Sequence, residues 1–150
     1  MTRRKKEFHF GTSLKWTNDQ QGVASCTGKP NVEVACPPVF NPKSPEDAWT
    51  PEDLLVSAVE VCLLMTFVSR ARRRGIEFKS YTSRADGTLE FVDDCMMFTK
   101  IEIEVDIEVP KGQDKDLVVE TLLTSEDRCF VTRSMKVGAT IKPNIVYTRD

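Results

Sequence analysis

One long apolar segment constrains this fold more than any other feature of the sequence. Between Leu54 and Val68 apolar residues occupy nearly every position, and Ser57, Glu60 and Thr66 are the main interruptions. A helix that is apolar around most of its circumference is buried on most sides. The sequence therefore predicts a central helix that is covered by the rest of the domain.

Both ends of this segment carry helix signals. Thr50 can cap the first turn, Pro51 suits the first helical position, and Glu52 and Asp53 complement the positive end of the helix dipole. Four arginines between positions 70 and 74 precede Gly75, which is a typical carboxyl-terminal helix signal. We therefore predict a helix that begins at Pro51 and ends just before Gly75.

Alternating residues predict a sheet. Apolar residues at 101, 103, 105, 107 and 109 alternate with charged ones at 100–108, which is typical of an antiparallel strand with one buried and one wet face. The remaining pattern predicts strands at 8–16, 22–27, 32–38, 78–85, 89–92 and 137–147, the last interrupted by Pro143, and a short helix at 114–123. The two strands before residue 93 are expected on either side of Asp86-Gly87. This order indicates one α+β domain over residues 1–150, with antiparallel sheets around a long central helix.

Composition excludes several classes of function. The 150 residues are 40% hydrophobic and 29% charged, with a net charge of −2, so nothing favours nucleic acid as a partner. No charge-free apolar run of about 18 residues is present, and we expect no membrane span. The first ten residues are basic and lack an apolar stretch, so we expect no secretory signal and a cytoplasmic protein.

Two of the five cysteines stand in segments that suggest redox chemistry. Cys62 lies within the apolar helix, and Cys129 lies in the separate segment 127–136. A thiol nucleophile with a resolving thiol can reduce a peroxide and be regenerated by another thiol. The alternative is that both are buried thiols that act as small apolar residues. Cys26 and Cys36 are expected to pack, and Cys95 is expected to be a partly exposed residue of a turn or strand. The single His9 leaves no basis for a metal site or other cofactor.

Three stretches carry a resemblance to a known family. Thr-Pro-Glu-Asp-Leu-Leu at 50–55, Cys-Leu-Leu-Met-Thr-Phe at 62–67 and Cys-Phe-Val-Thr-Arg-Ser-Met-Lys at 129–136 resemble the OsmC/Ohr family of osmotically inducible and organic hydroperoxide resistance proteins. The resemblance implies an intertwined homodimer that reduces organic hydroperoxides and is recharged by dithiols. It also implies that Cys62 attacks the peroxide, that Cys129 resolves the product, and that Glu52 is the active-site acid.

One position departs from this resemblance. The family's peroxidases carry an arginine just before a glycine-containing turn after the first strand, whereas this sequence has Gln20 in the stretch 18–22. Without that cation, the Cys62 thiolate needs another source of stabilisation, because burial in an apolar helix raises a thiol's pKa. Arg128 and Arg133 are the best candidates in the sequence, and Lys15 is a weaker one.

The ten-residue spacing between Glu52 and Cys62 bears on whether they can share a site. Along one continuous helix these residues stand about 15 Å apart, which no glutamate side chain spans. If both serve one site, either Glu52 comes from a second chain or the helix starts after it. The first option matches the homodimer, in which two such helices could cover each other.

Together these features predict a thiol-dependent reductase of organic hydroperoxides that works through Cys62, Cys129 and Glu52. A second interpretation is an OsmC-like protein without peroxidase activity that binds a small apolar ligand or a protein partner. A third is a thiol transferase that uses Cys62 alone.

Overall fold

The structure is a computed structural model that describes residues 6–149. Arg3 and Arg4, which contribute to the prediction that no secretory signal is present, lie outside this range. The chain forms two compact units, which divide between Leu54 and Leu55. The assignment of residues 1–150 to a single domain stays a prediction, and each unit is described by itself.

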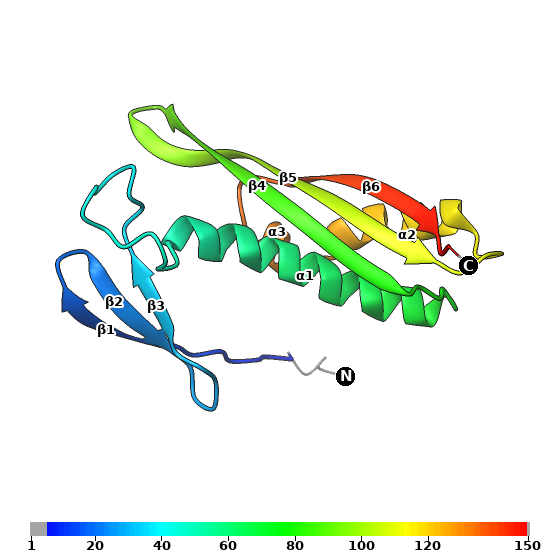
Figure 1. Ribbon diagram of the computed structural model, residues 1–150, viewed down its shortest axis with the longest axis horizontal. Helices are drawn as coiled ribbons and strands as arrows, with labels where there is room; N and C mark the ends of the chain where they lie inside the picture. Colours follow the sequence, from blue (N-terminus) through cyan, green and yellow to red (C-terminus); the bar gives the residue numbers. More distant parts are fainter. Residues whose placement is uncertain (1–5, 150) are drawn as a thin grey trace, which may run out of the picture. The chain divides into compact units, whose positions relative to one another are not determined.

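The first unit contains a small antiparallel sheet. Its strands β1 (Ser13–Asn18), β2 (Gln21–Ser25) and β3 (Val32–Ala35) pair in chain order (Figure 1). Trp49 extends the edge of β3, where its N–H donates to the Glu33 carbonyl at 3.0 Å. The strands predicted at 22–27 and 32–38 are confirmed as β2 and β3, whereas the strand expected from residue 8 begins only at Ser13.

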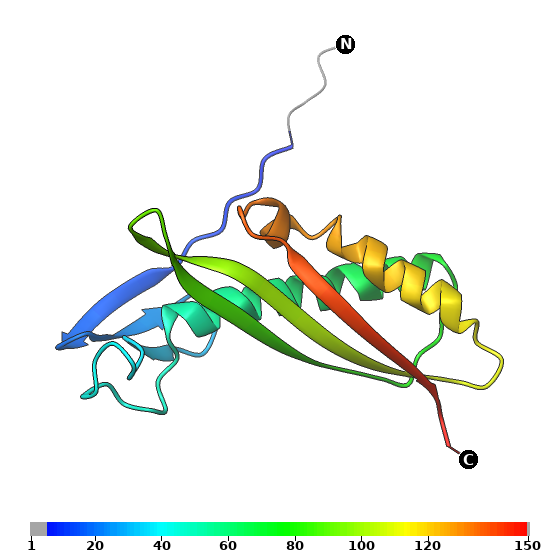
Figure 2. The ribbon, with the colours of Figure 1, turned by 90° about the horizontal axis from the view of Figure 1, so that it is seen from above.

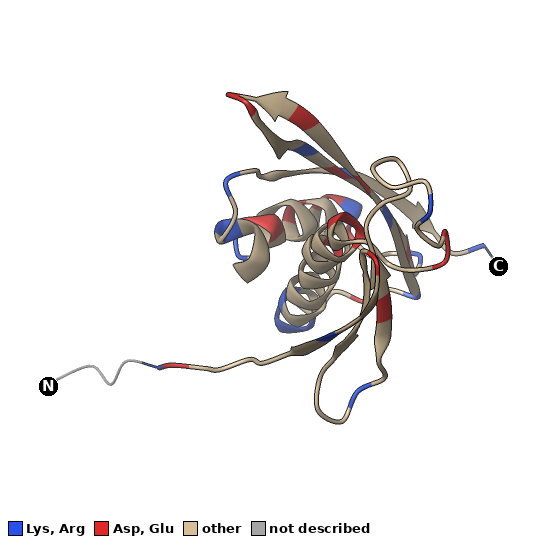
Figure 3. Ribbon diagram, turned by 90° about the vertical axis from the view of Figure 1, so that its left-hand side faces the viewer, with Lys and Arg blue, Asp and Glu red and all other residues tan. Residues whose placement is uncertain are grey.

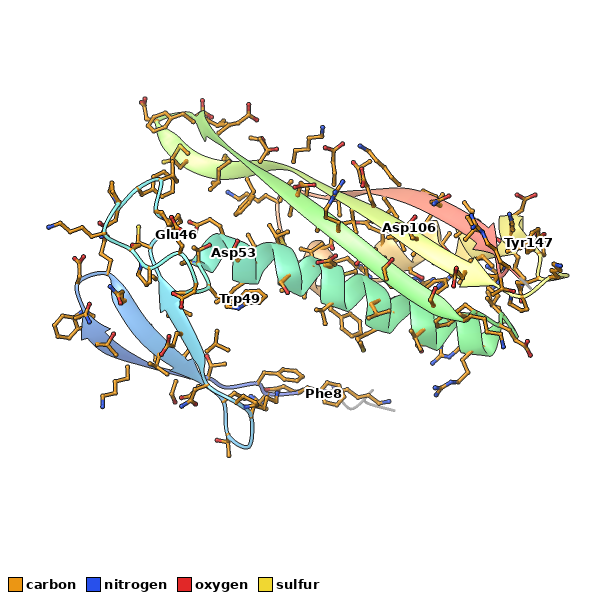
Figure 4. All side chains as sticks on the ribbon, in the orientation of Figure 1. Phe8, Glu46, Trp49, Asp53, Asp106 and Tyr147 are labelled. Atoms are coloured by element: carbon orange, nitrogen blue, oxygen red, sulfur yellow. The ribbon has the colours of Figure 1, made fainter. Side chains whose placement is uncertain are left out.

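Helix α1 (Pro51–Arg73) has the predicted boundaries. The Asp53 N–H donates to Thr50 Oγ1 at 3.1 Å, and the Thr50 N–H donates to Asp53 Oδ2 at 3.0 Å, so the two residues form a reciprocal cap (Asp53 is labelled in Figure 4). At the other end Gly75 takes a positive φ of 66°. The Ile76 N–H then reaches the Ala71 carbonyl at 2.9 Å and closes the helix.

Only one side of α1 is fully buried. Val59, Leu63, Phe67 and Ala71 recur every four positions and are at most 1% exposed, so they form a single stripe. Two other apolar positions remain open, since Val61 is 50% and Met65 58% exposed. The prediction that the helix is buried on most sides is therefore wrong for the isolated chain. Within the second unit, α1 contributes only this stripe to the hydrophobic core.

The second unit is built on a larger sheet. Strands β4 (Ser80–Val92), β5 (Cys95–Val109) and β6 (Ala139–Tyr147) lie in that order, and helices α1 and α2 (Lys115–Glu126) share one face of the sheet (Figure 2). The odd-numbered residues of β5 from Ile101 to Val109 are fully buried in the core with the stripe of α1. Their even-numbered neighbours, such as Asp106 (Figure 4), are exposed or half-buried. The predicted two-faced strand is thus confirmed.

The region before β5 differs from the sequence-based prediction. β4 is one strand of 13 residues, and Asp86-Gly87 lies inside it rather than between two strands. A Cβ atom at Gly87 would stand 2.7 Å from the Phe98 ring and 2.7 Å from a Val56 methyl group, so this glycine permits close packing. The turn lies instead at Asp93 and Asp94, whose φ values of 47° and 62° are typical of a tight two-residue hairpin.

The last strand also departs from expectation. β6 pairs with β5 in parallel, so the second sheet is mixed and not purely antiparallel. α2 and the short helix α3 (Phe130–Arg133) form the connection that a parallel pair requires. Pro143 does not interrupt β6, because β6 is an edge strand and its outer side has no ladder bond to lose.

Helix α2 confirms the prediction made for residues 114–123 and continues to Glu126. Its N-cap is Asp114, whose carboxylate accepts the N–H groups of Asp116 and Leu117 at 2.9 and 3.2 Å. α3 was not predicted, because four residues are too few to give a periodic pattern.

The length and hydropathy of α1 also meet the criteria for a membrane span. The absence of such a segment was predicted from the charges within the run, and mean hydropathy gives the opposite result. A core helix produces the same signal, and the buried stripe of α1 accounts for the apolar character of that side.

Charges on the second unit are interspersed (Figure 3). On the outer face of the sheet, Arg84 pairs with Glu104 at 2.8 Å and Lys142 pairs with Glu102 at 3.0 Å. These exposed pairs contribute little to stability. They mark the solvated face that the alternation of β5 predicted.

Candidate active site

The fold brings Cys62 and Cys129 together. Cys62 lies in the middle of α1, and Cys129 is the N-cap residue of α3, which sits beside α1 (Figures 1 and 2). The Cys129 thiol donates a hydrogen bond to the Cys62 sulfur. The structure has no disulfide between them.

Several donors converge on Cys62. Burial raises the pKa of the Cys62 thiol, but hydrogen bonds from the Cys129 thiol, from the backbone N–H groups of Val131 and Phe130 and from the Thr66 side chain outweigh it. The pKa of Cys62 is therefore lower than that of an ordinary thiol. A lower pKa increases the thiolate fraction near neutral pH, and the thiolate is the nucleophile.

Cys129 has the opposite character. It is fully buried, and burial together with its hydrogen bond to Cys62 raises the pKa of its thiol. Thr132 works against this rise, because its backbone N–H and its hydroxyl both donate to the Cys129 sulfur, the hydroxyl at 3.2 Å. The two pKa values thus move in opposite directions, so Cys62 gives up its proton more readily than Cys129.

The donors at Cys62 are neutral groups, not the arginines that the sequence suggested. Arg128 and Arg133 are exposed, and neither is among the largest influences on the pKa of either cysteine. Sequence reasoning missed Thr66, Thr132 and the first amides of α3. The only signal was spacing, since Thr66 follows Cys62 by one helical turn and Thr132 follows Cys129 by three positions.

Glu52 does not join the cysteines within one chain. It lies in the first turn of α1, ten positions before Cys62 on an unbroken helix, so the two are about 15 Å apart along the axis. The helix begins before Glu52, which excludes a later start as an explanation. Glu52 Oε2 is shielded from solvent and has no hydrogen-bond partner among the described residues.

The other three cysteines are far from this pair in the sequence. The Cys26 thiol donates to the Gly11 carbonyl at 3.5 Å, and Cys95 is exposed at the β4–β5 turn. Within residues 6–149, no three histidine, cysteine or acidic side chains gather in a way that could hold a metal ion.

Comparison with protein families gives a match over most of the chain. The family model described as OsmC-like protein matches residues 44–144, which include all three predicted site residues. The chain belongs to the OsmC-like family. A search of curated protein sequences finds no match.

Solved structures share the OsmC-like fold at low sequence identity. An OsmC-like protein of unknown function from Vibrio cholerae is 16% identical, with a TM-score of 0.85, over 92% of this chain and 100% of that one. An OsmC-like protein from Mycoplasma pneumoniae is 14% identical, with a TM-score of 0.76, over 96% and 100%. An organic hydroperoxide resistance protein from Elizabethkingia anophelis is 15% identical, with a TM-score of 0.74, over 96% and 99%.

In this OsmC-like chain, Gln20 occupies the position at which the resemblance implies an arginine. Its Oε1 accepts a hydrogen bond from Asn41 Nδ2 at 3.0 Å. Gln20 and Glu52 line the same cavity of 360 Å³ in the first unit, beside Trp16, Cys36 and other mainly apolar residues. The cavity that Glu52 lines thus also presents the neutral amide of Gln20.

Proposed function

We propose that this OsmC-like protein is a thiol-dependent peroxidase that reduces organic hydroperoxides through Cys62 and Cys129. The observation that carries the proposal is the cysteine pair, in which neutral donors lower the pKa of Cys62 while burial raises the pKa of Cys129. Two adjacent thiols that served only as packing would not need such an arrangement of donors.

The chemistry takes two steps. The Cys62 thiolate attacks the distal peroxide oxygen, the O–O bond breaks, and the released alkoxide takes up a proton and leaves as an alcohol, so that Cys62 becomes a sulfenic acid. The Cys129 sulfur then attacks the Cys62 sulfur, the S–O bond breaks, and the leaving hydroxide takes the proton of Cys129 and departs as water. An external dithiol reduces the resulting disulfide and is itself oxidised to a disulfide.

Organic hydroperoxides are the proposed substrates for two reasons. The solved structures that resemble this chain include organic hydroperoxide resistance proteins from Elizabethkingia anophelis and Bacillus subtilis. The surroundings of Cys62 on α1 are also apolar, with Leu63 buried and Leu64 half-buried beside it. We place the reaction in the cytoplasm, because the five free cysteines match a reducing compartment.

The working form in this proposal is a homodimer. Val61 and Met65 leave an apolar strip open on α1, and Phe10 and Trp16 are 96% and 69% exposed in the first unit. Apolar surface of this extent commonly marks an interface. A second chain would cover it and could also bring its Glu52 to Cys62, which the same chain's Glu52 cannot reach along the helix. We expect Met65→Glu to convert a dimer to a monomer in analytical ultracentrifugation, and Glu104→Gln on the outer sheet face to leave it unchanged.

Peroxide consumption tests the activity. With cumene hydroperoxide and a dithiol, we expect the wild type to consume the peroxide and Cys62→Ser to consume none above background. We expect Cys129→Ser to consume one equivalent of peroxide and then to continue only slowly. Cys95→Ser is the matched control, because it removes an exposed thiol away from the pair. Consumption by Cys62→Ser at the wild-type rate would contradict the proposal.

The second candidate function is binding without peroxide reduction. Gln20 and the mainly apolar cavity favour it, since the site lacks the cation that the resemblance implies. This function predicts no consumption by the wild type and saturable binding of a small apolar probe in the first unit. A Trp16→Phe variant would then lose the fluorescence change that binding causes, because Trp16 lines that cavity.

A further inference from the structure

Two threonines contact the cysteine pair, one at each sulfur. Thr66 lies one turn after Cys62 on α1, and its side chain donates a hydrogen bond to the Cys62 sulfur. Thr132 lies in α3, is buried, and its Oγ1 donates to Cys129 Sγ at 3.2 Å. Each hydroxyl therefore donates to one sulfur of the pair: Thr66 to Cys62 and Thr132 to Cys129.

The two sulfurs need their negative charges at different moments. Cys62 must be a thiolate before peroxide arrives, whereas Cys129 must give up its proton only after Cys62 has been oxidised. A hydrogen bond to a thiolate is stronger than one to a thiol, because the acceptor is charged. Each hydroxyl thus favours the charged form of the one sulfur that it contacts.

We infer that Thr66 and Thr132 divide the catalytic cycle between them: Thr66 stabilises the Cys62 thiolate for attack on the peroxide, and Thr132 stabilises the Cys129 thiolate for closure of the disulfide. Both are positioning residues, since neither takes part in the bonds that form or break. The inference rests on the proposed peroxidase function, and it adds which hydroxyl controls which step.

Charged side chains near the pair do not supply this stabilisation. The largest influences on either thiol are burial, the other cysteine and neutral donors. Three charged side chains near the pair are hydrogen-bonded elsewhere. Glu60 accepts from Ser83, Arg70 donates to Thr124, and Glu126 accepts from the Ala139 N–H. On the sheet, the β5 residues that face the core are apolar. Along the chain, the charged side chains nearest the two cysteines are Glu60 and Arg70 on α1, Glu126 at the end of α2, and Asp127, Arg128 and Arg133 around α3.

Alkylation of the resting protein tests the first half of the inference without any peroxide. Iodoacetamide labelling at each cysteine is followed against pH by peptide mass spectrometry, so all five thiols stay in place. We expect Thr66→Val to raise the labelling midpoint of Cys62 by about one pH unit, which is the loss of one hydrogen bond to a charged group. Thr66→Ser keeps the hydroxyl and should restore the wild-type midpoint.

A single turnover tests the second half. After one equivalent of cumene hydroperoxide, the Cys62 sulfenic acid is trapped with dimedone and the 62–129 disulfide is measured at the same times. We expect Thr132→Val to slow disulfide formation about tenfold and to keep the rate of the first step within about threefold. Thr132→Ser should close the disulfide at the wild-type rate.

Three results would overturn the inference. They are an unchanged Cys62 midpoint in Thr66→Val, unchanged disulfide closure in Thr132→Val, and a failure of the serine variants to restore behaviour, which would make side-chain shape the cause. If Cys62→Ser still consumes peroxide, the proposed function fails instead. The labelling midpoints of Cys62 in Thr66→Val and of Cys129 in Thr132→Val still decide the threonine roles in that case.

Discussion

The two units of this chain treat their apolar side chains in opposite ways. In residues 55–150, Phe67 and the alternate residues of β5 are fully buried in one core. In residues 1–54, every residue of β1 is exposed, and Phe8, Phe10 and Trp16 are open to solvent. The second unit is therefore stabilised by its own core, whereas the first leaves most of its large apolar side chains open to solvent.

This difference also separates the predicted site residues. Cys62 and Cys129 belong to the unit that has a core, where a buried thiol can be held against fixed donors. Glu52 and Gln20 belong to the unit whose surface is open. The two cysteines meet within one chain. In our proposal, association of two chains brings Glu52 to them.

The largest expected effect contrasts two phenylalanines. Phe67→Ala removes a ring that is 0% exposed and whose centroid lies 5.6 Å from that of Phe78. We therefore expect a loss of about 3–5 kcal/mol in the free energy of unfolding. Phe10→Ala, at 96% exposed, should change it by under about 0.5 kcal/mol at low protein concentration. Urea unfolding measures both. Equal losses would contradict the contrast between the units, and a Phe10→Ala loss that grows with protein concentration would locate Phe10 in an interface.

Two glycines sharpen the same contrast. Gly87→Ala places a Cβ atom 2.7 Å from both Phe98 and Val56, and we expect a cost of about 1–3 kcal/mol from overpacking. Gly11 in the first unit has open space around it, so Gly11→Ala should be neutral or stabilise by less than about 1 kcal/mol. Thermal unfolding of the two variants is the measurement. Equal stability of the Gly87→Ala and Gly11→Ala proteins would show that the side chains of Phe98 and Val56 can move aside at little cost.

The two helix caps differ by a smaller amount. Thr50 accepts one N–H at the start of α1, whereas the Asp114 carboxylate accepts two at the start of α2 and carries a charge that suits the helix dipole. We expect Thr50→Ala to cost about 1 kcal/mol and Asp114→Ala slightly more. Urea unfolding at neutral pH checks the order, and serine at either position should recover most of the loss.

The smallest effect is a pH dependence confined to alkaline solution. Burial, with a further contribution from the charge of Glu60, raises the pKa of Tyr81 to about 12. Between about pH 10 and 12 the unfolded chain loses this proton while the folded chain keeps it, so the free energy of unfolding falls as pH rises through that window. The chain has two tyrosines, so Tyr147→Phe leaves Tyr81 as the only source of phenolate absorbance. A midpoint near 10 in the folded variant would contradict the burial of Tyr81.

Local signals predicted much of the fold. The cap at Thr50, the glycine after the arginines and the alternation in β5 each act within a few residues, and all three are confirmed. The predictions that failed depend on distant partners. Gly87 was expected to separate two strands, but it lies where Phe98 and Val56 approach the backbone, and no local pattern reports that approach.

The family resemblance and the residue types led to Cys62, Cys129 and Glu52 as candidate residues, and their roles stay predictions. What activates Cys62 was not available from the same source. The sequence suggested arginines, whereas the donors are the amides at the start of α3 and the Thr66 hydroxyl.

The sequence by itself determined where α1 begins and ends, which strand has a buried face, and which cysteines stand in unusual surroundings, because these features depend on residues close together in the chain. Only the tertiary structure decided that Cys62 meets Cys129 and that β6 runs parallel to β5. It also decided that one side of α1 stays open. Each of these depends on segments that are dozens of residues apart, and the packing of side chains in three dimensions fixes them.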